Sequence, residues 1–112
     1  MGEVHLAVDT RLNRKVALKS LTDPSLDTPQ ARSRLLREAR AAAQITHPNI
    51  AAIYDILETG AHPCIVMEYA QGETLARIAS RGPMPGHQVL AIALQLADAL
   101  SHAHAAGVVH RD

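Results

Sequence analysis

The chain has 112 residues, enough for one modest domain or for part of a larger one, and too few for a multidomain assembly. Eleven basic and 11 acidic residues give a formal net charge of +0, so we expect no bulk attraction to nucleic acid or anionic lipid. With 20 alanines, 2 tyrosines and no phenylalanine or tryptophan, the core must consist of small aliphatic side chains.

The first part of the chain alternates between apolar and polar residues, which predicts β-strands. Val4, Leu6 and Val8 share one face of a strand with period two. Residues 9–14 are polar and turn-like, and residues 15–21 then have the pattern of a second strand. Because the connection is short, we expect the two strands to form an antiparallel hairpin.

A helix is expected over residues 29–45, with Thr28 as its cap and Pro29 at its first position. It must end before Pro48, because the residue preceding a proline avoids the helical conformation. Two further strands are predicted over residues 50–58 and 63–69, joined by a turn. The second contains a continuous apolar run, as is typical of a strand buried on both faces.

The chain changes character after Tyr69 and becomes helical. A short helix over residues 74–80, opened by Thr74, is followed by a cluster rich in glycine and proline. A long helix over residues 87–106 carries an apolar stripe of helical period and is ended by Gly107. We expect a strand fragment over residues 108–112.

Cys64 is the single cysteine, which excludes an intramolecular disulfide and a cysteine-rich zinc site. This cysteine content favours a reducing, cytoplasmic location. No apolar run has the length of a membrane span, and the first residues lack the features of a signal peptide. We therefore expect a chain without a membrane segment.

Five segments, in this order along the chain, carry a resemblance to a known family. They are Gly2-Glu3-Val4-His5-Leu6-Ala7, Val16-Ala17-Leu18-Lys19, Glu38 in the first long helix, Ile65-Val66-Met67-Glu68-Tyr69, and His110-Arg111-Asp112. Together they resemble the ordered signature of a protein kinase, and the closest likeness is to the serine/threonine kinases of bacteria. The resemblance covers the whole chain but only part of the family's domain.

The resemblance implies an α+β fold of two parts. Residues 1–70 would be the small lobe of a kinase, an antiparallel sheet with one long helix. Residues 71–112 would be the start of the large helical lobe, truncated at His-Arg-Asp. The boundary is expected near Gln71-Gly72, where the composition changes.

The resemblance also implies an activity, the transfer of the γ-phosphoryl group of ATP to a serine or threonine hydroxyl of a protein substrate. Lys19 would hold the phosphates, and Glu38 would orient Lys19. Asp112 would accept the proton of the substrate hydroxyl. The alternative from another class is a non-catalytic module with the same fold that binds nucleotides or partners.

The residues that would bind ATP follow from the same motifs. Gly2 is the last glycine of the phosphate-binding loop, and we expect the chain to begin at an internal methionine within that loop. Val4 and Ala17 would enclose the adenine ring. The remaining expected contacts lie at the hinge between the lobes: Met67 as gatekeeper, the backbone of Glu68 and Ala70 at the adenine edge, and Glu73 at the ribose.

The chain ends at Asp112, before the asparagine and the D-F-G aspartate that bind magnesium in the family. We therefore expect Mg²⁺ to serve the complete enzyme, with its ligands outside this sequence, and the 112-residue chain to be inactive alone.

Histidines offer a rival interpretation, a metal site formed by His102, His104 and His110. On a helix, residues two apart point about 200° apart around the axis, so His102 and His104 would not converge. We expect no metal site in this chain. His104 is expected to pack inward and His102 to face solvent.

Overall fold

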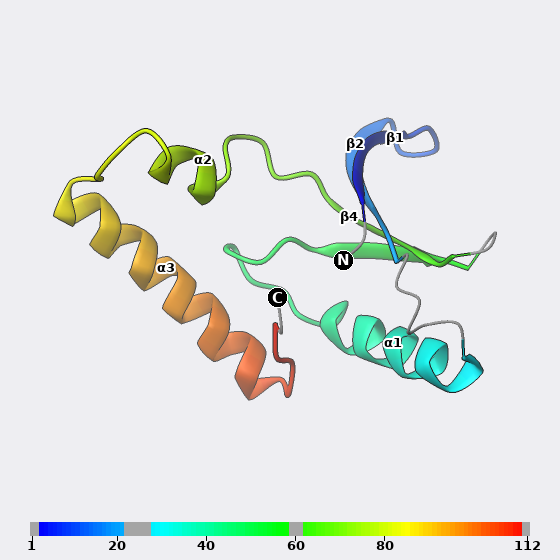
Figure 1. Cartoon of the computed structure of the whole chain (residues 1–112). Helices are drawn as coiled ribbons and strands as arrows, with labels where there is room; N and C mark the ends of the chain where they lie inside the picture. The colour runs from blue at the N-terminus through cyan, green and yellow to red at the C-terminus, as the bar shows by residue number, and fades with distance from the viewer. Residues whose placement is uncertain (1–2, 22–27, 59–61, 111–112) are drawn as a thin grey trace.

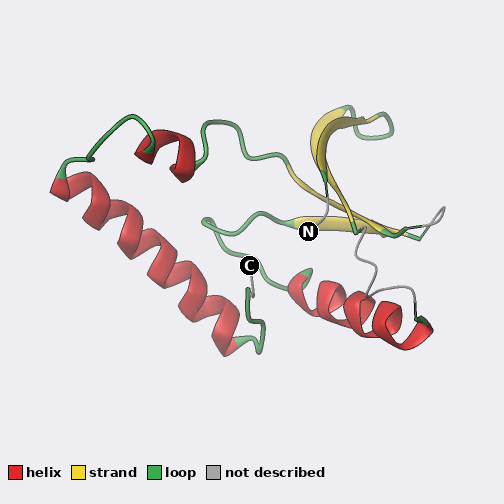
Figure 2. Ribbon diagram, viewed as in Figure 1, coloured by secondary structure: helices red, strands yellow, loops and turns green. Residues whose placement is uncertain are grey.

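A computed structural model describes residues 3–21, 28–58 and 62–110. A four-stranded sheet with one long helix beneath it forms one region, and a second helical region lies beyond it (Figures 1 and 2). This arrangement confirms the predicted α+β class. The elements in chain order are β1 (Val4–Asp9), β2 (Arg14–Ser20), α1 (Pro29–Ala42), β3 (Ile53–Leu57), β4 (Cys64–Glu68), α2 (Leu75–Ala79) and α3 (Gly86–Ala105).

The predicted hairpin is present. β1 and β2 pair antiparallel, from Val4 opposite Lys19 to Asp9 opposite Arg14. The carboxylate of Asp9 accepts hydrogen bonds from the backbone N–H groups of Arg11 and Leu12, at 3.0 and 3.1 Å. Asn13 completes the turn with a φ of 51°, a conformation that asparagine tolerates better than most residues.

β4 lies in the interior of the sheet, whose strand order is β1-β2-β4-β3. It pairs antiparallel with β2 on one side and with β3 on the other, with a register irregularity between Ile53 and Asp55. Ile65 is buried, and Val66 and Met67 are half-buried. β4 therefore has a strand neighbour along both edges, and its apolar run is buried or half-buried on both faces of the sheet.

α1 begins as predicted and ends earlier. The backbone N–H of Ala31 donates to Thr28 Oγ1 at 3.2 Å, and Pro29 occupies the first turn. The helix stops at Ala42, because Gln44 and Ile45 donate to carbonyls only three residues back. The prediction that it continues to Ile45 was wrong.

β3 also begins later than predicted, at Ile53 instead of residue 50. The N–H of Ile50 donates to the carbonyl of His47 at 3.1 Å. This bond folds residues 47–50 into a turn, so these residues cannot extend the strand.

α3 ends at a glycine turn, as its sequence predicts. Gly107 has a φ of +75°, the N–H of Gly107 donates to the carbonyl of His104, and the N–H of Val108 donates to that of Ala103. This is the paired hydrogen-bond pattern by which a left-handed glycine closes a helix. Residues 108–110 form no strand, so the predicted strand fragment was wrong for them, and residues 111–112 lie outside the described ranges.

α3 leaves most of its apolar stripe uncovered. Ala99 is its one buried residue. Its large apolar side chains with more than a third of their surface exposed are Val89, Leu90, Leu94, Leu96 and Leu100. None of the described helices has both the length and the apolar character needed to cross a bilayer.

The buried core is made of small and medium aliphatic residues, as the composition requires. Its members are Val16, Ala17, Leu36, Ala39, Ile45, Ile65 and Ala99. Leu36 and Ala39 come from α1, which packs beside β3. The burial of these side chains against the sheet is therefore the main force that holds α1 in place.

We expect Leu36→Ala to lower the free energy of unfolding by about 2 to 3 kcal/mol, because it leaves a cavity in the core. Leu36 is 8% exposed, whereas Leu90 on α3 is 61% exposed. Leu90→Ala is the matched control and should change stability by less than about 0.5 kcal/mol. Urea unfolding followed by circular dichroism measures both, and equal losses would contradict this assignment of the core.

Candidate active site

Residues from three strands meet on one face of the sheet. In an antiparallel sheet, residues directly opposite each other on neighbouring strands point to the same side. Val4, Lys19 and Ile65 form one such row. Leu6, Ala17 and Met67 form the next. We call the surface formed by these six residues the lysine face; it contains four of the side chains predicted to bind nucleotide.

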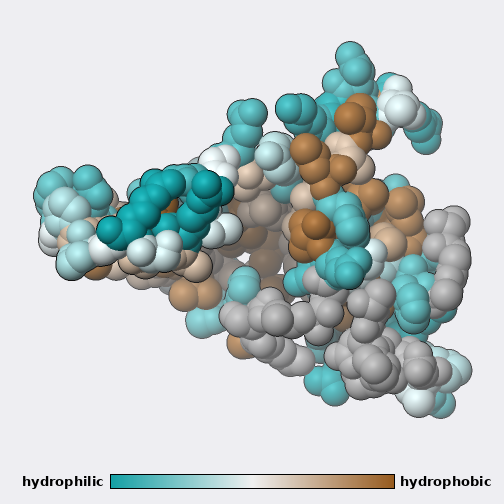
Figure 3. Space-filling view, turned by 45° about the horizontal axis from the view of Figure 1, so that its top comes forward, coloured by the Kyte–Doolittle hydropathy of each residue, from teal (hydrophilic) through white to brown (hydrophobic). Residues whose placement is uncertain are grey.

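The lysine face is apolar and open at its β1 end. Val4 and Leu6 are 60% and 57% exposed, whereas Ala17 is buried and Met67 is half-buried. In the space-filling view, apolar side chains gather over the β1–β2 hairpin (Figure 3). An open apolar surface above a small buried alanine is suited to contact a flat heterocycle.

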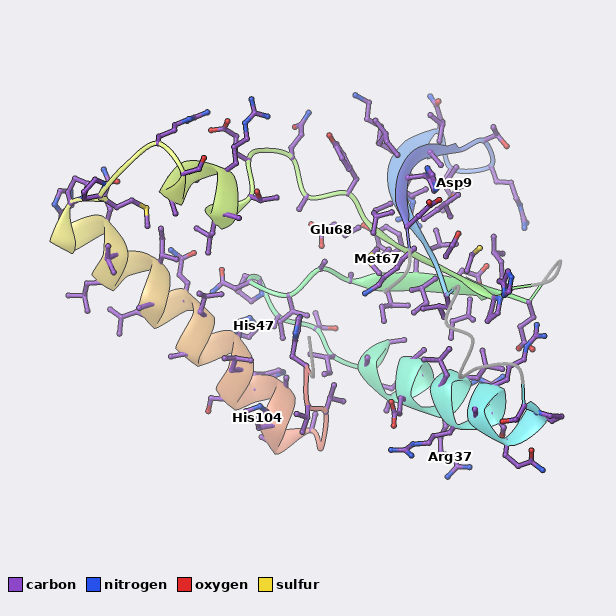
Figure 4. All side chains as sticks on the ribbon, viewed as in Figure 1. Asp9, Arg37, His47, Met67, Glu68 and His104 are labelled. Carbon is purple, nitrogen blue, oxygen red and sulfur yellow. The ribbon has the colours of Figure 1, made fainter. Side chains whose placement is uncertain are left out.

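Lys19 supplies a positive charge next to this apolar surface. Its side chain is half-buried on β2. Glu38, its predicted partner, lies on α1, where its Oε1 is 3.2 Å from the Nε of Arg34, one turn earlier. Arg37, on the same helix, points away from the sheet (Figure 4). The ion pair between Lys19 and Glu38 stays a prediction.

Glu68 lies where β4 leaves the sheet, next to Met67 (Figure 4). Its Oε2 accepts a hydrogen bond from the backbone N–H of Ala52 at 3.1 Å, and its own N–H donates to the Ala52 carbonyl at 2.8 Å. The side chain therefore fastens the end of β4 to the segment that precedes β3. Ala70, two residues further on, is exposed.

Glu73 forms ion pairs with two arginines. Its Oε1 is 3.2 Å from the Nε of Arg77 and also contacts a terminal nitrogen of Arg81. Thr74 caps α2, as predicted, by accepting a hydrogen bond from the Arg77 N–H at 3.2 Å. A ribose hydroxyl bound by Glu73 would have to share its carboxylate with both guanidinium groups.

Two predicted site residues, Gly2 and Asp112, lie outside the described ranges. His110 is the last described residue before Asp112 and is exposed. After the turn at Gly107 the chain reverses and runs back from the end of α3 (Figure 1). The sequence links the long helix directly to the motif expected to act on the substrate.

The histidines of α3 do not form a metal centre. No group of three or more histidine, cysteine, aspartate or glutamate side chains in the described ranges is arranged to hold a metal ion. His104 is exposed, so the expectation that it packs inward was wrong. His102 is exposed as predicted, but its ring lies 5.1 Å from that of His47.

A hollow lies on the opposite face of the sheet. It has a volume of about 700 Å³, and Val16, Leu18 and Val66 form its floor. Arg14, on its wall, stacks over the ring of Tyr54 at 3.7 Å and lies 3.6 Å from the Asp9 carboxylate. None of the predicted nucleotide-binding residues that the structure describes lines this hollow, and its Arg14 cation is already paired with the carboxylate of Asp9.

Sequence reasoning did not single out Leu6 and Ile65 of the lysine face as site residues, and it missed the pair of His47 and Asp98 elsewhere in the fold. Leu6 completes the lysine face, and the alternation of β1 already pointed to it. His47 and Asp98, 51 residues apart, form a hydrogen bond 3.0 Å long between Nε2 and Oδ2. No local sequence pattern connects them. In the sequence, His47 and Pro48 indicate only where the preceding helix must end.

The sequence pattern of the protein kinase domain matches residues 1–112. The chain is 40% identical over 112 residues to serine/threonine-protein kinase pkn2 of Myxococcus xanthus. It is 44% identical over 117 aligned residues to serine/threonine-protein kinase PknB of Mycobacterium leprae. Both alignments cover 100% of this chain, but only 14% and 19% of those relatives.

Solved structures show the same similarity. Two crystal structures of the PknI kinase domain of Mycobacterium tuberculosis, one of them a point mutant, superpose with TM-scores of 0.82 and 0.87 at 36% and 33% identity. Each superposition covers all of this chain and slightly less than half of the solved domain, 46% and 47%.

We expect Glu68→Ala to lower the free energy of unfolding by about 1 kcal/mol, because the N–H of Ala52 loses its acceptor. Glu68→Gln keeps an oxygen there and should lose less than half as much. Glu58→Ala is the surface control: it removes an exposed ion pair with Arg40, 3.6 Å long, and should cost less than about 0.5 kcal/mol. Urea unfolding would contradict the role of Glu68 if its alanine variant matched the Glu58 control.

Proposed function

Because this chain belongs to the protein kinase family, we propose that it is the ATP-binding part of a serine/threonine protein kinase. The observation that carries the proposal is the lysine face, where Val4, Ala17, Lys19 and Met67 lie in two adjacent rows. We place the boundary between the two lobes after Ala70, beyond the last strand and before the first large-lobe helix.

The residues of the lysine face fit the chemistry of ATP. The apolar surface of Val4, Leu6 and Ala17 suits the adenine ring, and the backbone at Glu68 and Ala70 suits its hydrogen-bonding edge. The Glu68 side chain is already bonded to Ala52, so the hinge contact would be made by main-chain groups.

Lys19 would hold the phosphates. A positive charge beside an apolar surface interacts strongly with an anion, because the low local dielectric screens it less than water does. Glu38 would keep the Lys19 ammonium in place, and Asp112 would accept the proton of the attacking hydroxyl. The chemical contribution of this chain would then be to position and to stabilise charge.

Mg²⁺ neutralises phosphate charge in phosphoryl transfer and requires oxygen ligands. The asparagine and the D-F-G aspartate that bind it in the family are not among these 112 residues. We propose that the 112-residue chain binds the nucleotide and does not transfer phosphate alone.

We expect Lys19→Met to weaken ATP binding at least about tenfold, because a charge-assisted contact to the phosphates is lost. Lys15→Met is the matched control, since Lys15 lies on the same strand, points to the same side as Lys19 and is exposed. Isothermal titration calorimetry with ATP measures both. Equal affinities for the two variants would refute the role of Lys19.

We expect the chain to show no measurable transfer of radiolabelled γ-phosphate from ATP to a general protein substrate in the presence of Mg²⁺. The expectation follows because these 112 residues do not include the asparagine and the D-F-G aspartate that bind magnesium in the family. Phosphate transfer that disappears in Lys19→Ala would show that the chain is itself an active kinase.

A further inference from the structure

The segment between α1 and β3 is fastened to the rest of the chain at two places. At one end, Ala52 is paired with Glu68, at the point where β4 leaves the sheet. At the other end, His47 is paired with Asp98 in the middle of α3. The segment thus contacts both the end of β4, from which the chain continues to α2, and α3 itself.

His47 is held by two hydrogen bonds that use both nitrogens of its ring. Nδ1 accepts from the backbone N–H of Asn49 at 3.1 Å, and Nε2 lies 3.0 Å from Asp98 Oδ2. A ring nitrogen that accepts a hydrogen bond carries no proton, so the proton of neutral His47 is on Nε2 and is donated to the carboxylate. The bond to Asn49 therefore selects the tautomer that binds Asp98.

The contact is nearly closed to water on the histidine side. The His47 side chain is 9% exposed, whereas that of Asp98 is 72% exposed. The ring of His102, one turn after Asp98, lies 5.1 Å from the ring of His47, tilted by 40°. His47 lies beside α3 (Figure 4).

We infer that His47 is a positioning residue that fixes α3 to the segment following α1. α1 carries Glu38, and α3 leads through Gly107 and His110 to Asp112. The bond from His47 to Asp98 thus links the segment that follows the Glu38 helix to the helix that precedes Asp112 in the sequence. The positioning itself stands on the geometry, and only its consequence for catalysis rests on the proposed function.

Three variants of the full 112-residue chain separate the two hydrogen bonds of His47. His47→Asn places an amide oxygen near the position of Nδ1 and cannot reach Asp98. His47→Gln places an amide nitrogen near the position of Nε2 and keeps the donor to Asp98. Asp98→Ala removes the acceptor at an exposed position. Alanine has a higher helix propensity than aspartate, so the substitution itself does not weaken α3, and faster exchange in α3 would report the lost hydrogen bond.

Hydrogen exchange measured by mass spectrometry reports the result without nucleotide. We expect His47→Asn and Asp98→Ala each to accelerate exchange of the last two turns of α3 about fivefold, the effect of losing one such hydrogen bond. The double variant should exchange no faster than either single variant, and His47→Gln should stay close to the unchanged chain. Ser101→Ala, at an exposed position of α3, is the control and should have no effect.

A second measurement does not depend on how the His47 variants fold. In the unchanged chain, ¹⁵N spectra of the imidazole should show His47 as the Nε2–H tautomer, and Asp98→Ala should shift the Nε2 resonance. The inference is overturned if His47 is the Nδ1–H tautomer, if the two single effects add, or if Ser101→Ala matches Asp98→Ala. Because no arm contains ATP, these outcomes leave the role of Lys19 untouched.

Discussion

The antiparallel register of β2 with both of its neighbours is the constraint on which the rest of the structure depends. It sets Ala17 opposite Leu6 and Met67, and Lys19 opposite Val4 and Ile65. A slip of one residue would turn Ala17 and Lys19 to the other face, because side chains alternate along a strand. The register is fixed by the short turn capped by Asp9 and by the burial of Val16 and Ile65.

The small buried core explains why α3 is held less firmly than the sheet and α1. Small aliphatic residues bury little area each, and six of the seven buried core residues belong to the sheet, to α1 or to the segment after it, whereas α3 contributes only Ala99. The exposed stripe on α3 contrasts with the single buried Ala99. Polar contacts then have more influence on where α3 lies, and the pair of His47 and Asp98 is the best placed of them in the described ranges.

The elements that could be predicted from the sequence are those determined locally. Thr28, Thr74 and Gly107 define helix ends through their own hydrogen bonds or backbone freedom, and alternation defines the strands. The end of α1 and the irregular residues 108–110 were mispredicted, because turn hydrogen bonds there override the apolar pattern.

For the candidate site, most residues of the lysine face could be predicted, but the side-chain partners around it could not. The family resemblance named Ala17, Lys19 and Met67, and the observed strand pairing places them on one face. The partners of Glu68, Glu73 and His47 were not predictable, since each depends on side chains brought together by the fold or by a neighbouring helical turn.

The central claim is that nucleotide binds on the lysine face and not in the hollow on the opposite face. Methyl resonances distinguish the two, because Ala17 and Met67 lie on the lysine face and Leu18 and Val66 line the hollow. In a titration of the ¹³C-methyl-labelled chain with a non-hydrolysable ATP analogue, the account predicts shifts at Ala17 and Met67 and none at Leu18 and Val66. Shifts confined to Leu18 and Val66 would contradict it.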